Sequence, residues 1–71
     1  MERMLLYSME RQRPIRLIWQ EDGRLIQRRA TVTALTENTV TVRSLRPKTE
    51  VTLQRESILS ADFVKGDEGQ G

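Results

Sequence analysis

Residues 15–35 read IRLIWQEDGRLIQRRATVTAL, and this stretch decides the fold. At its start, Ile15, Leu17 and Trp19 share one face of an extended chain, while the residues between them share the opposite face. A period of two is the signature of a β-strand that is buried on one side. We therefore predict a strand that begins at Ile15.

The turn Asp22-Gly23 joins this strand to the next one. Both central positions of a type I′ turn have positive φ, and Asp-Gly is among the pairs that favour such a turn. The second strand is predicted at 24–35, and a two-residue turn pairs Trp19 with Ile26. This register places Arg28 on the core face, so we expect a β-bulge next to it.

Two further loops extend the hairpin into a meander. The loop 36–38 and the loop 45–48 separate three stretches of alternating apolar residues. A slip of one residue would turn every apolar side chain to the wrong face, so the pattern fixes the register. The predicted cross-strand pairs are Val32 with Val42, Ala34 with Val40, Val42 with Val51, and Val40 with Leu53.

The two ends of the chain have different patterns. Leu5 and Met9 lie four residues apart in a segment without alternation, which predicts a short amphipathic helix at 2–12 that ends before Pro14. A tight turn after Leu53 leads to a final strand. We predict one domain over residues 1–64 and a disordered tail at 65–71, which is rich in Gly and charged residues.

The predicted layout is mainly β: a short N-terminal helix followed by five strongly bent antiparallel strands. This is the layout of an SH3-like or Sm-like barrel, and residues 5–64 resemble the bacterial WYL domain, an Sm-like barrel usually attached to a helix-turn-helix. The resemblance rests on Leu5-Leu6, Met9-Glu10, Ile15-Arg16-Leu17-Ile18-Trp19, Asp22-Gly23, Arg28-Arg29, Val51-Thr52-Leu53 and Ile58-Leu59-Ser60.

The WYL resemblance implies the barrel fold and a regulatory role. Where the Trp-Tyr-Leu triplet of that family would fall, this chain has Thr39-Val40-Thr41, so small-molecule sensing ranks third among the functions considered. A weaker resemblance is to the YolD-like proteins, through Ile15, Trp19, Asp22-Gly23 and Ile58.

The composition argues against catalysis. The 71 residues include no Cys and no His, so the usual thiol nucleophile and imidazole base are absent. Glu21-Asp22, the one adjacent acidic pair outside the tail, lies at a predicted hairpin tip. We expect a protein that is not an enzyme, with no catalytic residue, no metal site and no cofactor. No apolar run approaches the roughly 18 residues of a membrane span, so we expect a cytoplasmic protein without membrane contact.

Basic residues are the first candidates for a binding site. Ten of the 12 basic residues are Arg, whose planar guanidinium suits phosphate and carboxylate groups. In a meander the first and third hairpin tips lie at one end, so we expect Arg24 to approach Arg46 and Lys48, and Arg28 to lie opposite Arg46. The predicted site for anions, RNA or DNA is Arg24, Arg28, Arg29, Arg43, Arg46 and Lys48. The alternative is an ordinary solvated face paired with Glu21, Asp22 and Glu50.

A second function from a different class is a protein-interaction or assembly module. Leu5, Met9 and Trp19 are the candidate interface residues, together with exposed strand edges that could pair with another chain. Such a module would form a homo-oligomer or join a larger protein partner. Trp19 and the helix stripe have a second interpretation, in which they pack inside the domain of this chain.

Overall fold

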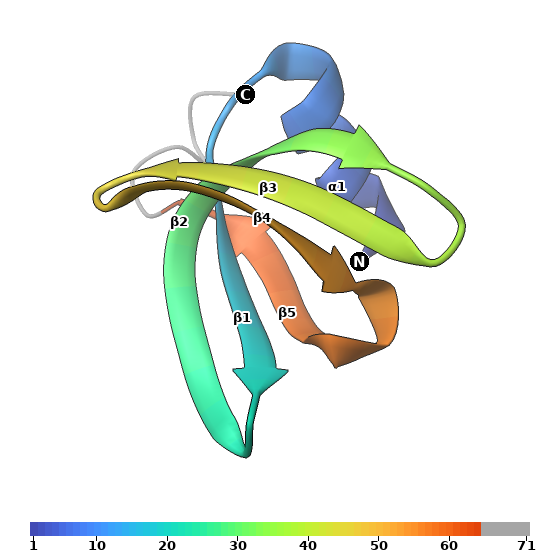
Figure 1. The fold of residues 1–71 in the computed structure, drawn as a ribbon. Helices are drawn as coiled ribbons and strands as arrows, with labels where there is room; N and C mark the ends of the chain where they lie inside the picture. Colours follow the sequence, from blue (N-terminus) through green and yellow to red (C-terminus); the bar gives the residue numbers. More distant parts are fainter. Residues whose placement is uncertain (65–71) are drawn as a thin grey trace.

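The computed structural model describes residues 1–64, so the predicted tail at 65–71 lies outside the described residues. One helix precedes five strands, and a single 3-10 turn interrupts them (Figure 1). The elements are α1 (Glu2–Arg11), β1 (Ile15–Glu21), β2 (Arg24–Leu35), β3 (Thr39–Leu45), β4 (Lys48–Gln54), the 3-10 helix Arg55–Ser57, and β5 (Ile58–Phe63).

The five strands form one antiparallel sheet in the order β4-β3-β2-β1-β5. This confirms the predicted class, in which a short helix precedes five antiparallel strands. The sheet is strongly bent, since β1, β2 and β5 run across the direction of β3 and β4 (Figure 1). Within residues 1–64, β4 and β5 do not pair with each other, so the sheet stays open and does not close into a barrel.

The first hairpin has the predicted turn and register. Asp22 and Gly23 have φ of 50° and 76°, as a type I′ turn requires. Trp19 faces Ile26, and the ladder from β1 to β2 is uninterrupted from the turn to Ala30. The bulge predicted next to Arg28 is therefore wrong. Arg28 does lie on the face of buried Leu17, its partner in the ladder, but it is exposed because no strand covers that part of β2.

The bulge lies further along β2, between Val32 and Ala34. Val32 faces Val42 as predicted, but Ala34 faces Thr41, so the predicted pair of Ala34 with Val40 is wrong. The extra residue lets Leu35 pack against the core while Ala34 is exposed. Burying the larger apolar side chain is the more favourable choice, because the free-energy gain scales with the apolar area removed from water.

The second and third hairpins join at β3. Both predicted pairs between β3 and β4 are confirmed, since Val42 faces Val51 and Val40 faces Leu53. The connection is shorter than predicted, because Leu45 and Lys48 already pair across a two-residue turn. The core lies between the two bent halves of the sheet and α1. Its buried apolar residues are Leu5, Ile15, Leu17, Trp19, Ala30, Val32, Val40, Val42, Leu53 and Ile58.

The hydroxyl of Ser8 joins the helix to the sheet. The backbone N–H of Val32 donates to Ser8 Oγ at 2.9 Å, and this hydroxyl donates to the carbonyl oxygen of Arg13 at 2.6 Å. Ser8 is fully buried. Extending the register of β1 and β2 by two residues beyond the Ile15–Ala30 pair would place Arg13 opposite Val32. The Ser8 hydroxyl thus takes the place of the next backbone hydrogen bond of that ladder.

Helix α1 is short and lies mainly over β2 and β5. It ends at Gln12, which is left-handed with φ of 53°, and the N–H groups of Gln12 and Arg13 both point to the carbonyl of Ser8. Within residues 1–64, no helix is long and apolar enough to cross a membrane.

Replacing Ser8 tests this junction. Ser8→Ala leaves the N–H of Val32 without its hydrogen-bond acceptor in a buried position, which should lower the free energy of unfolding by about 1–3 kcal/mol. Urea denaturation followed by circular dichroism measures the change. Ser60→Ala is the matched control, because Ser60 is exposed on β5 and its loss should cost less than about 0.5 kcal/mol. Equal effects of the two substitutions would show that the Ser8 bridge does not stabilise the fold.

Candidate anion-binding face and strand fork

Strand β2 changes partners halfway along its length. Residues from Arg24 to Ala30 pair with β1, whereas pairing with β3 begins at Thr31. The two hairpins, β1 with β2 and β3 with β4, diverge from this point (Figure 1). We call this point the strand fork. It positions the basic residues that the sequence analysis selected.

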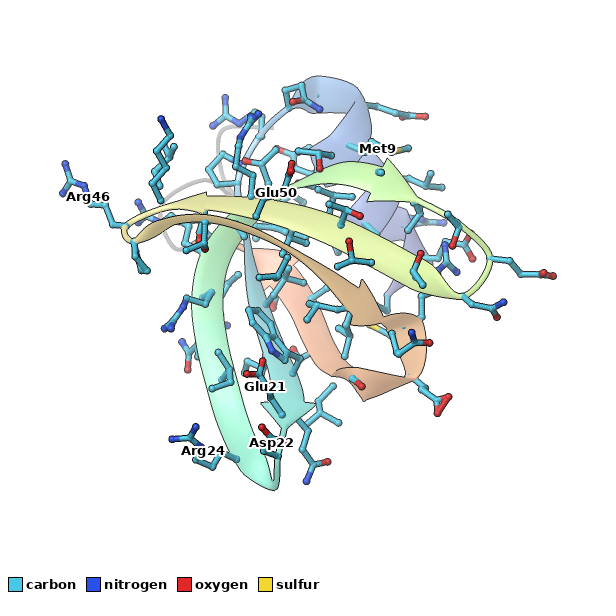
Figure 2. The ribbon with its side chains drawn as sticks, in the orientation of Figure 1. Met9, Glu21, Asp22, Arg24, Arg46 and Glu50 are labelled. Atoms are coloured by element: carbon cyan, nitrogen blue, oxygen red, sulfur yellow. The ribbon has the colours of Figure 1, made fainter. Side chains whose placement is uncertain are left out.

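The hairpin tips do not gather the predicted basic residues. Arg24 lies at the tip between β1 and β2, and Arg46 lies at the tip between β3 and β4 (Figure 2). The tips point apart, so Arg24 does not approach Arg46 or its neighbour Lys48. Arg28 pairs with Leu17 of β1 instead of facing Arg46. The expected proximity fails because β2 and β3 separate before they reach these residues.

Three arginines do come together on the outer face of the sheet. Arg16 of β1 lies directly opposite Arg29 of β2. Arg43 of β3 lies opposite Thr31, which is two residues beyond Arg29 on the same face of β2. We call Arg16, Arg29 and Arg43 the arginine face.

Beside the arginine face is a shallow hollow, lined by Arg16, Gln27, Arg28, Arg29 and Val64. Arg16 was not among the predicted site residues. The predicted hairpin register already implied that Arg16 lies opposite Arg29, so the signal for Arg16 was present in the sequence.

The arginine face keeps a net positive charge, although two of its arginines have an acidic residue directly opposite them in the ladder: Asp62 faces Arg16, and Glu50 faces Arg43. Like charges that lie directly opposite each other in an antiparallel pair are destabilising, and Arg16 with Arg29 is such a pair. Arg16 Nη2 lies 3.9 Å from Asp62 Oδ2, but both side chains are largely exposed, so this ion pair is weak. Glu50 faces Arg43 in the ladder but makes no salt bridge with it, and the Glu50 carboxylate accepts a hydrogen bond from Thr33 Oγ1 at 3.4 Å.

None of the six predicted basic residues makes a salt bridge with another residue in 1–64; they are Arg24, Arg28, Arg29, Arg43, Arg46 and Lys48. Arg3 and Arg11 make none there either. An anion that bridged Arg16 and Arg29 would remove their repulsion and form charge-assisted hydrogen bonds.

The predicted interface residues belong mostly to the core of this chain. Leu5 is 1% exposed and Trp19 is 5% exposed, and Met9 is partly buried against the same cluster. Leu5 and Trp19 are therefore too buried to form a contact surface, which corrects that part of the interface hypothesis. Trp19 Nε1 donates to Glu21 Oε1 at 3.1 Å, so its polar atom is satisfied within the hairpin.

A groove opens on the inner side of the fork, between the two diverging hairpins. Its lining includes Ile26 and Arg28 from β2, Val42 and Ser44 from β3, and Thr49 and Val51 from β4. We call it the fork groove. Val51 is 40% exposed there, whereas its partner Val42 is buried. Arg28 lines both this groove and the outer hollow.

Comparisons of this chain with models of protein families, with curated proteins and with solved structures gave no match. The resemblances to the WYL domain and the YolD-like proteins therefore stay predictions from the sequence.

Proposed function

We propose that this chain is a non-catalytic, nucleic-acid-binding regulatory module that holds phosphate groups on the arginine face. The observation that supports this most is the direct opposition of Arg16 and Arg29, with Arg43 close by on the same face. Phosphate neutralisation by such side chains favours binding because it releases condensed counterions. The buried ring of Trp19 offers no stacking surface, so the proposed mode is contact with the sugar-phosphate backbone.

Charge-neutral substitutions test this proposal. Arg29→Gln with Arg43→Gln should weaken binding to a single-stranded oligonucleotide and lower the slope of log Kd against log salt by about 1.4, which is 0.7 for each lost phosphate contact. Fluorescence anisotropy at several salt concentrations measures both quantities. The matched control is Arg24→Gln with Arg46→Gln, which removes the same charge from the two separated tips.

The control should change the slope by less than half as much as the face variant. Equal losses from the two double variants would show that net charge alone attracts the oligonucleotide. The absence of salt-dependent binding by the unaltered chain at low ionic strength would contradict the proposed function outright.

A second candidate function is assembly through strand edges, and the open sheet favours it. The sheet order leaves β4 and β5 as edges, and unpaired edges are templates for strands of other chains. This candidate no longer includes Leu5, because a charge at that buried position would disrupt folding.

Light scattering tests the assembly candidate. Assembly predicts a mass that is a multiple of the single-chain mass and is unaffected by salt or oligonucleotide. Val51→Asp, which places a charge on a partly exposed edge residue, should return the mass to that of one chain, while Thr52→Asp on the opposite face of β4 should have less effect. A single-chain mass at millimolar concentration would exclude self-assembly through these edges.

A further inference from the structure

The first half of β2 is itself an edge of the sheet. β1 lies on one side of it, and β3 joins the other side only at Thr31. Among residues 1–64, Figure 1 shows no strand beside this half of β2 on the side away from β1. The backbone here is therefore able to receive one more strand.

Two observations show which backbone groups point outward. In a two-residue hairpin the residues that flank the turn exchange backbone hydrogen bonds, and these are Glu21 and Arg24. Hydrogen-bonded and non-hydrogen-bonded pairs alternate along an antiparallel ladder. The backbone N–H and C=O groups of the even-numbered residues of β2 therefore point to β1. The N–H of Val32, which points to Ser8 on the β1 side, agrees with this phase. The N–H and C=O groups of Leu25, Gln27 and Arg29 consequently point to the unpaired side.

The side chains along this edge follow a regular order. Alternation places Arg24, Ile26 and Arg28 on the inner face, beside the fork groove. Ile26 is half-buried, and the two flanking arginines are exposed without a salt bridge to any residue in 1–64. The inner face of this edge therefore carries a cationic side chain at Arg24, an apolar side chain at Ile26 and a second cationic side chain at Arg28.

We propose that this edge binds an extended peptide of another protein, with the pattern acidic-x-apolar-x-acidic, as an added strand on β2. Its backbone would pair with Leu25, Gln27 and Arg29, and its acidic side chains would lie beside Arg24 and Arg28. Its central apolar side chain would lie beside Ile26 at the fork groove. Cross-strand pairs of opposite charge and of apolar residues are the pairs that stabilise antiparallel sheets.

The other two edges specify a partner less well. β5 carries a register shift where Leu59 is inserted opposite β1, and bulges are a common means of blocking an edge. β4 carries Lys48 and Glu50 on one face, which are charges of opposite sign. Along the edge of β2 both charged side chains on the inner face are cationic. The one acidic side chain that lines the adjacent groove, Glu21, lies opposite Arg24 and accepts a hydrogen bond from Trp19, so the net charge of the edge and groove is positive and points to an acidic partner. This inference does not depend on the arginine face, which lies on the outer side of the sheet.

Three synthetic peptides test the proposal with the full chain. The first is Thr-Glu-Thr-Val-Thr-Glu-Thr, blocked at both ends. The second, Thr-Thr-Glu-Val-Glu-Thr-Thr, has the same composition but places its acidic groups on the face opposite valine. The third replaces both glutamates of the first with lysine. The first should bind at least tenfold more tightly than either of the others, as measured by NMR titration.

Charge reversal provides the matched variant. Arg24→Glu with Arg28→Glu changes two exposed side chains. Because the first substitution places a like charge opposite Glu21 at the exposed hairpin tip, circular dichroism first checks that the fold persists. This variant should lose the first peptide and bind the lysine peptide instead. Amide hydrogen exchange gives the readout specific to strand addition: the first peptide should slow exchange at Leu25, Gln27 and Arg29.

Each other outcome would overturn the proposal. Equal affinity for the first two peptides would show that the edge attracts any acidic peptide by its positive charge, without a defined strand register. Binding without slower exchange at Leu25, Gln27 and Arg29 would rule out strand addition. Slower exchange at these three amides on self-association, or on adding an oligonucleotide in place of a peptide, would assign the edge to a second copy or to nucleic acid. A positive result with a failed oligonucleotide test would leave this inference standing without the proposed function.

Discussion

The buried hydroxyl of Ser8 is the contact on which the arrangement of the two hairpins depends. It accepts from the N–H of Val32 and donates to the carbonyl of Arg13, so it satisfies two backbone groups where the ladder of β1 and β2 ends. A buried backbone group without a partner carries a substantial free-energy cost. Because the hydroxyl accepts the hydrogen bond of the Val32 N–H, this N–H of β2 is not left unpaired there, so β1 can begin at Ile15 while β2 continues toward β3. The hydrogen bond with Val32 and the burial of Leu5 in the core hold the helix over the sheet.

The change of partner along β2 has a consequence on each face of the sheet. On the outer face it brings Arg43 of β3 near the pair of Arg16 and Arg29. On the inner face it separates the two hairpins and leaves a groove beside Ile26. Both candidate binding surfaces therefore arise from one feature of the backbone, even though they use different side chains and favour different partners.

The elements that short-range rules control were predictable from the sequence. The turn at Asp22-Gly23 fixed the pairing of Trp19 with Ile26, and apolar alternation fixed the pairing of Val42 with Val51. The position of the bulge was not predictable in this way, because Ala34 and Leu35 are both apolar and only the packed core selects the larger one. The Ser8 bridge was missed since serine on a short helix carries no signal of burial. The separation of Arg24 from Arg46 follows from the bend of the sheet, which pairwise registers do not encode.

The most direct test of this account is amide hydrogen exchange along β2 in the isolated chain, measured by NMR. The account predicts slow exchange at Ile26, Arg28, Ala30 and Val32, whose N–H groups face β1 or Ser8. It predicts fast exchange at Leu25, Gln27 and Arg29, whose N–H groups face the unpaired side. Equally slow exchange at all seven amides, or fast exchange at Val32, would contradict the claim that β2 changes partners at a point held by Ser8.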